Sequence, residues 1–129
     1  MNLKKRILVV DDEPDIAMMV KSRLEANGYE VEVVHSGEEC LKKIAGHSDV
    51  DLVVLDVILP HLSGYEVCAE IKIRKSMSLP VVMLTSRNKI IDEQLGYLCK
   101  ADAYIHKPLS GELLIPTIEE LLSGCPGEK

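Results

Sequence analysis

The sequence predicts an α/β protein built from five consecutive strand-helix units around a parallel sheet. Three observations lead to this prediction: short apolar runs recur at even spacing, helical apolar patterns separate them, and polar residues directly follow most of the runs. Runs that are apolar throughout are typical of strands buried on both faces. Strict alternation of strand and helix specifies right-handed crossovers with helices on both sides of the sheet. The predicted strands cover residues 7–10, 31–34, 52–55, 81–84 and, more weakly, 104–105.

The first helix is predicted directly after the first strand. Pro14 suits its first turn, where the missing N–H is not needed, and Gly28 suits the left-handed position after its end. Apolar residues recur between these two signals at helical spacing and form one stripe on the helix. The stripe consists of Ile16, Met19, Val20 and Leu24.

Capping signals predict where the second and third helices begin. Residues 36–39 and residues 63–66 both read S-x-x-E, the capping box in which the first and last side chains bind each other's backbone N–H groups. Gly46 is expected to close the second helix. Two further helices are predicted over about residues 88–99 and from Ser110 onward.

Length and composition indicate one globular domain. The chain has 129 residues, of which 47% are hydrophobic and 28% charged, and it needs no disulfides or metals to build a core. We predict a domain over residues 1–122, followed by a flexible tail or the start of a linker over residues 123–129. The formal charge of −6 argues against direct binding of nucleic acid by this domain, since such binding depends on Lys and Arg.

Targeting and membrane signals are weak. The basic residues 4–6 precede an apolar run of residues 7–10 that is too short for a signal peptide, and no stretch approaches the length of a membrane span. The expected location is therefore the cytoplasm, with no membrane partner.

The cysteines and histidines do not show the spacing of a metal or redox motif. Cysteines within helical patterns are expected to be buried small hydrophobic residues, and the histidines to be surface or loop residues. The cysteines are Cys40, Cys68, Cys99 and Cys125, and the histidines are His35, His47, His61 and His106.

Polar residues at the strand ends are the strongest functional signal. Asp11 and Asp12 follow the first strand, Asp56 the third, Thr85 the fourth, and Lys107 lies just after the fifth. Ligands of open parallel sheets bind beyond the carboxyl ends of the strands, so these side chains are expected to meet at one edge. A single aspartate there would more often be a helix cap or a loop residue, but four strand ends that carry such residues favour a functional site.

The residue types predict the chemistry of this edge. Three neighbouring carboxylates repel one another unless a cation neutralises them. Oxygen ligands without Cys or His suit Mg²⁺, which takes one or two carboxylates directly and keeps several waters. A phosphate could complete its coordination, and a lysine could neutralise the remaining charge. The pattern therefore predicts a Mg²⁺-assisted phosphoryl site with one carboxylate as the nucleophile.

The chain resembles the receiver domains of two-component response regulators over about residues 5–122. The resemblance rests on four stretches in the right order, each at the end of a predicted strand: ILVVDDEPDI, DLVVLDVILPHLSGYEV, PVVMLTS and ADAYIHKP. It implies a CheY-like, flavodoxin-like fold of five β-α units, with a parallel sheet in the order 2-1-3-4-5. It also implies a phosphoacceptor module of a phosphorelay rather than a turnover enzyme.

The resemblance assigns the phosphoryl and metal ligands. Asp56 would accept the phosphoryl group from a phosphohistidine on a histidine kinase or a histidine phosphotransfer protein. Asp12 and Asp56 would bind Mg²⁺, Asp11 would assist through water, and the backbone carbonyl of Ile58 would be a further ligand. Mn²⁺ is a possible substitute. Lys107 would pair with the phosphoryl oxygens.

The resemblance also implies a switch. The Thr85 hydroxyl would move onto the phosphate, and Tyr104 would follow it inward. The readout would be the face formed by the helix over 88–99, the strand at 104–105 and the helix from Ser110. That face could bind a downstream protein, a fused output domain or a second copy of the chain.

Several positions depart from the usual pattern of the family. Leu109 stands where Phe is usual and keeps an apolar contact. Lys100 stands where Gly usually ends a helix, which predicts a looser or different ending. Pro116 lies within the fifth predicted helix and predicts a kink or a late start. Ile58 and Arg87 flank the expected phosphate and could obstruct attacking water, which predicts slow loss of the phosphoryl group.

Three alternative functions would also use an α/β fold or an aspartate at a strand end. A nucleotide- or flavin-binding protein would have Gly, Ser or Thr in the first strand-helix loop, whereas this loop reads Asp-Asp-Glu-Pro. A haloacid-dehalogenase-type phosphohydrolase would have D-x-D-x-T/V after the first strand. A degenerate receiver that acts as a docking module without phosphate is the third, and the complete set of site residues argues against it.

Overall fold

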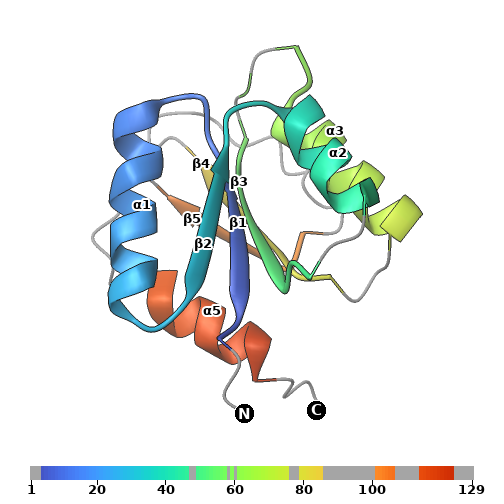
Figure 1. The fold of residues 1–129 in the computed structure, drawn as a ribbon. Helices are drawn as coiled ribbons and strands as arrows, with labels where there is room; N and C mark the ends of the chain where they lie inside the picture. The colour runs from blue at the N-terminus through green and yellow to red at the C-terminus, as the bar shows by residue number, and fades with distance from the viewer. Residues whose placement is uncertain are drawn as a thin grey trace.

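A computed structural model shows a five-stranded parallel sheet between two layers of helices (Figure 1). Strands and helices alternate as the sequence predicts over residues 6–70, whereas residues 86–100, where the fourth helix is predicted, lie outside the described part of the chain. The structure describes residues 4–46, 49–57, 59, 61–75, 79–85, 101–106 and 114–123.

The strand order is β2-β1-β3-β4-β5, which confirms the predicted topology. All four pairings are parallel, so the carboxyl ends of the strands lie along one edge. Each strand begins or ends within one residue of its predicted range. The strands are β1 (Arg6–Val10), β2 (Glu30–Val34), β3 (Leu52–Asp56), β4 (Val81–Thr85) and β5 (Ala103–His106).

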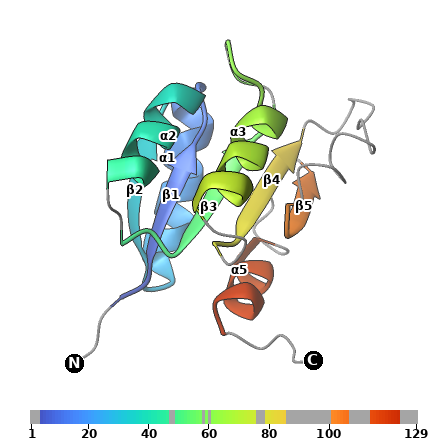
Figure 2. The ribbon, with the colours of Figure 1, turned by 90° about the vertical axis from the view of Figure 1, so that its right-hand side faces the viewer.

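The helices cover both faces of the sheet. Helices α1 (Pro14–Ala26) and α5 (Leu114–Leu122) lie on one side, and α2 (Gly37–Gly46) and α3 (Gly64–Glu70) lie on the other (Figures 1 and 2). A short π-helical segment, η1 (Ile71–Lys75), continues α3. The sequence pattern did not predict η1.

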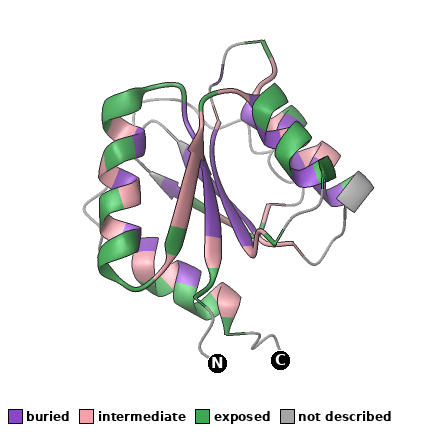
Figure 3. Ribbon diagram, in the orientation of Figure 1, coloured by how far each residue is buried: buried purple, intermediate pink, exposed green. Residues whose placement is uncertain are grey.

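Two apolar cores result because successive side chains of a strand point to opposite faces. Ile7 and Val9 of β1 belong to the core under α1 and α5, and Leu8 and Val10 belong to the core under α2 and α3. The central strands are buried on both faces, as Figure 3 shows in purple. The edge strand β2 is only partly buried, because no strand covers its outer side.

The predicted signals at α1 are confirmed. Pro14 is the first residue of the helix, and Gly28 has a positive φ of 93° just beyond its end. Val20 and Leu24 of the apolar stripe are fully buried, together with Ala17. The helix therefore begins at a residue that needs no backbone N–H and ends before a residue that tolerates a positive φ.

The two predicted capping boxes differ in the structure. At α3 the box is complete: Ser63 Oγ accepts from Glu66 N, and the Glu66 carboxylate accepts from Ser63 N. At α2, Ser36 Oγ accepts from Glu39 N, but the Glu39 carboxylate accepts from His35 N instead of Ser36 N. The second box was therefore predicted at the right place, but the N–H group that binds the Glu39 carboxylate belongs to the residue before Ser36.

Predictions for the C-terminal part are tested only partly. Residues 88–99 and Lys100 lie outside the described residues, so the predicted fourth helix stays a prediction. Pro116 is the third residue of α5 as described, and Leu114 and Ile118 on either side of it are fully buried. Residues 111–113 are not described, so the predicted late start of this helix is not tested.

Candidate functional site

Three carboxylates meet at the carboxyl edge of the sheet, as the strand-end pattern predicts. The ligand oxygens of Asp11, Asp12 and Asp56 all lie within 4.8 Å of one another. Asp11 and Asp12 directly follow β1, and Asp56 is the last residue of β3. The central strands β1 and β3 are neighbours, and Val10 pairs with Leu55. Residues 45 positions apart in the sequence are thus held together by the strand register.

The three carboxylates differ in exposure. Asp11 is fully buried, Asp56 is 5% exposed, and Asp12 is exposed to solvent. Asp11 Oδ1 accepts a hydrogen bond of 3.0 Å from the backbone N–H of Glu13. Two buried acidic groups beside an exposed one form a site that is open on one side, where a solvated ion could enter.

The backbone below Asp56 is packed tightly against α3. Gly64 N donates to the carbonyl oxygen of Val57 over 2.7 Å, and Val57 N donates to Leu84 O over 2.9 Å. A Cβ added to Gly64 would lie 2.2 Å from Asp56 O. The backbone φ of Gly64 is not in the left-handed region, so glycine is required here for this close approach.

A further contact at the site was missed by sequence reasoning. The ring nitrogen Nδ1 of His35 lies 3.1 Å from the backbone oxygen of Asp11. The backbone N–H of Asp11 also donates to Val34 O over 3.2 Å, so the residues after β2 support those after β1. His35 is exposed, as predicted, and its neighbour in space is visible only once β1 and β2 are paired.

The other predicted site residues are placed in part. Thr85 ends β4, and its backbone pairs with that of His106, the residue before Lys107. The side chain of Thr85 lies outside the description, as do Ile58 and Lys107. Tyr104 is on β5 and is 37% exposed, opposite Met83 of β4. The assigned roles of all these residues stay predictions.

The cysteine prediction is confirmed where it is tested. Cys40 and Cys68 are fully buried, and neither is part of a disulfide. Burial raises the pKa of Cys40 from 9.0 to about 12. Cys99 and Cys125 lie outside the described residues, so their expected states are not tested.

The acidic cluster fits a hard divalent cation. Its donors are oxygens alone, without sulfur or imidazole nitrogen among the ligand atoms of the group. Mg²⁺ favours such donors and binds few carboxylates directly, so water and a phosphoryl oxygen could fill the remaining positions. A phosphate group bound there would lie close to Asp56, the carboxylate at the end of the central strand β3.

Sequence comparison identifies the family. The sequence model of the response regulator receiver domain matches residues 7–119. The alkaline phosphatase synthesis transcriptional regulatory protein PhoP of Bacillus subtilis (strain 168) is 45% identical over 108 residues, which cover 84% of this chain and 44% of that protein. This chain spans less than half the length of the curated relatives that it matches.

Solved structures show the same fold. A receiver domain protein (CheY-like) from Methanospirillum hungatei JF-1 matches with a TM-score of 0.85 and 33% identity, covering 98% of this chain and 100% of that one. The response regulator TrrA from Thermotoga maritima, solved in complex with Mg²⁺-BeF, matches with a TM-score of 0.80 and 38% identity, covering 92% of this chain and 99% of that one.

Within the described part of the chain, no helix is long and apolar enough to cross a bilayer. The matched residues 7–119 lie inside the predicted domain of residues 1–122, whose exact boundary stays a prediction. The order of the five strands, the acidic cluster at their carboxyl edge and the match over most of the chain agree with one another. This chain belongs to the response regulator receiver domain family.

Proposed function

We propose that this domain is the phosphoacceptor of a two-component phosphorelay and that Asp56 accepts the phosphoryl group. The observation that carries the proposal is the cluster of Asp11, Asp12 and Asp56, whose ligand oxygens lie within 4.8 Å of one another at the carboxyl edge of the sheet. The likeness to a receiver solved with Mg²⁺-BeF supports the same reading.

The proposed metal ligands are those that the resemblance to receiver domains implies, and the exposure of Asp12 supports its part in this set. Asp12 faces solvent and would bind Mg²⁺ directly together with Asp56, while the buried Asp11 would assist through water. The backbone carbonyl of Ile58 would complete the protein's ligands, and Mn²⁺ could replace Mg²⁺. The bound cation would neutralise the carboxylates and the incoming phosphoryl oxygens.

The transfer step needs a nucleophile and a donor. A carboxylate oxygen of Asp56 attacks phosphorus as the P–N bond of the partner's phosphohistidine breaks. The histidine nitrogen keeps the electron pair of that bond, and a proton from solvent leaves the imidazole neutral. Lys107 would pair with the phosphoryl oxygens as a point charge. The donor would be a histidine kinase or a histidine phosphotransfer protein.

Phosphorylation would then shift the domain between two states. Thr85 would place its hydroxyl on the phosphate, and the partly exposed Tyr104 would turn inward. The shift requires only a difference in interaction free energy of a few kcal/mol between the states. The face around β5 and α5 would bind a downstream protein, a fused output domain or a second copy of the chain.

Phosphorylation in vitro tests the proposal. The protein is incubated with acetyl phosphate and Mg²⁺, and its intact mass is measured with and without EDTA. We expect a gain of one phosphate that requires the cation and is lost in Asp56→Ala. Asp49→Ala is the matched control, because Asp49 is an exposed aspartate outside the acidic cluster. The control should gain phosphate like the wild type.

The alternative is a docking module that does not use phosphate. The same measurement separates the two, since a docking module would show no gain in mass in the wild type while remaining folded. Turnover of added phosphate esters would instead indicate a phosphohydrolase. The named relatives are transcriptional regulators and receiver domains, which favours a signalling role over turnover.

A further inference from the structure

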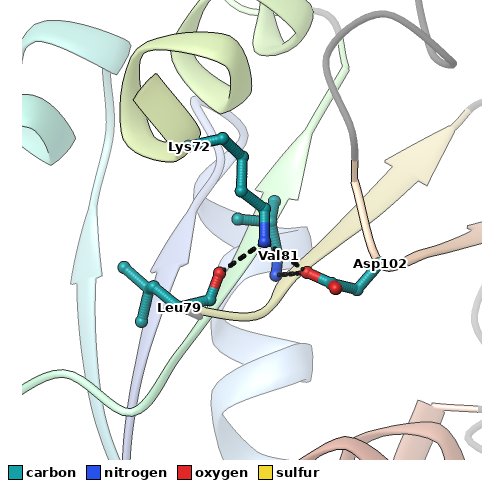
Figure 4. Close-up of polar contacts among 4 residues, drawn as sticks. All are labelled: Lys72, Leu79, Val81 and Asp102. Carbon is teal, nitrogen blue, oxygen red and sulfur yellow. Dashed lines mark hydrogen bonds and ion pairs between the residues drawn. The ribbon is translucent and has the colours of Figure 1, made fainter. Parts of the chain in front are cut away.

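An ion pair between a buried lysine and a partly exposed aspartate lies at the opposite edge of the sheet from the acidic cluster. Lys72 of η1 is 5% exposed, and its Nζ lies 2.7 Å from Asp102 Oδ2. The same ammonium donates to the backbone oxygen of Leu79 over 2.7 Å. Figure 4 shows the ammonium between these two acceptors. A buried ammonium needs such partners, because leaving water is costly for a charge.

Asp102 ties this ammonium to the beginning of the β4-β5 pair. Its Oδ2 also accepts from Val81 N over 2.8 Å (Figure 4). The backbone N–H of Asp102 donates to Val81 O over 2.8 Å. The next residues, Val82 and Ala103, form the first register pair of the two strands. The Asp102 carboxylate thus binds both the Lys72 ammonium of η1 and the backbone of β4, the strand with which β5 pairs.

β5 is a short strand at the end of the sheet. In the described part of the chain it has four residues and pairs with one strand, β4. A slip by one residue would exchange the buried Ile105 for a neighbour that points to the other face. The contacts of Asp102, one residue before the first register pair, are therefore well placed to determine the register of β5.

We propose that Lys72 is a positioning residue for the phosphoryl site, because it fixes through Asp102 the register with which β5 presents its carboxyl end. The inference rests on the proposed function, in which Thr85 and Lys107 contact the phosphoryl group. Thr85 pairs with His106, the residue before Lys107. Four strand residues span roughly 13 Å, so Lys72 acts through the strand and does not touch the phosphate.

The test compares two affinities in the folded protein. Mg²⁺ alone probes the acidic cluster, which lies on β1 and β3, whereas beryllofluoride with Mg²⁺ also probes the groups at the ends of β4 and β5. We expect Lys72→Met to weaken beryllofluoride binding by about tenfold, as small displacements of a binding group do. The affinity for Mg²⁺ alone should stay unchanged. Both are followed by NMR titration of the backbone amides around Asp56.

Control variants separate positioning from general destabilisation. Lys43→Met removes an exposed ion pair with Glu32 on another part of the surface and should change neither affinity. Lys72→Arg retains the charge and should restore most of the beryllofluoride affinity. If Lys72→Met does not fold, Asp102→Asn takes its place, because the amide oxygen can still accept from Val81 N while the charge is lost.

Two results would overturn the inference. One is equal beryllofluoride affinity in wild type and variant, and the other is a fall in both affinities by the same factor, which a merely structural role would cause. If the wild type itself binds Mg²⁺ but no beryllofluoride, the proposed function fails and this inference fails with it. The wild-type measurement thus distinguishes the two failures.

Discussion

Gly64 approaches the backbone of Asp56 so closely that a Cβ on Gly64 would lie 2.2 Å from the carbonyl oxygen of Asp56. The same added Cβ would lie 2.7 Å from the Cα of Val57. Neither is the flexible end of a side chain that could move away. The first residue of α3 therefore has to be glycine for the helix to pack below the proposed phosphoacceptor.

Substitution of Gly64 is expected to harm both stability and the site. Gly64→Ala should lower the free energy of unfolding by about 1–3 kcal/mol, because the added methyl group must displace backbone. It should also weaken Mg²⁺ binding, since the displaced backbone carries Asp56. Urea denaturation and Mg²⁺ titration measure the two effects.

Gly46→Ala is the matched control for this substitution. A Cβ at Gly46 would meet nothing within 4 Å, and the residue ends α2. The change in unfolding free energy should stay within about 1 kcal/mol in either direction. Equal losses in Gly64→Ala and Gly46→Ala would contradict the role of the close approach.

The complete capping box at α3 predicts a measurable contribution from Ser63. Ser63→Ala removes the acceptor of Glu66 N and should cost about 1 kcal/mol of unfolding free energy. Ser22→Ala, at an exposed position within α1, should be neutral or slightly stabilising because alanine favours the helix. Thermal and urea denaturation compare the two, and a neutral Ser63→Ala would show that the cap is dispensable.

The buried thiol of Cys40 is expected to make the free energy of unfolding fall at alkaline pH. Burial raises the pKa of its thiol from 9.0 to about 12, so the folded state holds the proton more tightly than the unfolded state. The resulting contribution to stability is complete below about pH 9 and is lost as the pH rises from 9 toward 12. A folded protein at pH 8 should thus have a Cys40 that is almost entirely protonated.

Alkylation with iodoacetamide at pH 8, followed by peptide mass spectrometry, tests this state. The peptide with Cys40 should react far more slowly in the native protein than in urea, because the thiolate is the reactive form. Native labelling at the rate seen in urea would show that Cys40 is open to solvent and would contradict its burial.

Ile58 is predicted to prolong the life of the phosphorylated state. Ile58→Asn should speed the decay of phospho-Asp56 by about tenfold, or about 1.4 kcal/mol in the barrier, because a polar side chain admits water. Decay is followed by intact mass after removal of the phosphodonor. Ile73→Asn is the control, since Ile73 is 80% exposed on η1 and distant in sequence from the site. An unchanged half-life in Ile58→Asn would refute the prediction.

Local sequence signals were enough to predict most of the fold. Strands that are buried on both faces need apolar residues throughout, which made β1, β3 and β4 visible in the sequence. Pro14, Gly28 and Ser63 predicted the ends of helices because their backbone or side-chain chemistry acts within a few residues. The weaker signal of η1 was missed, because a π-helical turn has no distinct pattern of its own.

The sequence predicted which residue types would follow the strands. The strand order then brings these residues together at one edge of the sheet. The sequence by itself determined that acidic residues would follow β1 and β3, because parallel strands all end at one edge. Only the tertiary structure decided that Asp11 is buried while Asp12 is exposed, that Gly64 packs on the carbonyl of Asp56, and that Lys72 pairs with Asp102. These contacts join residues far apart in the chain, and their distances depend on how α3 and η1 pack on the sheet. Periodicity describes one element at a time, whereas such packing depends on the shapes of all the elements together.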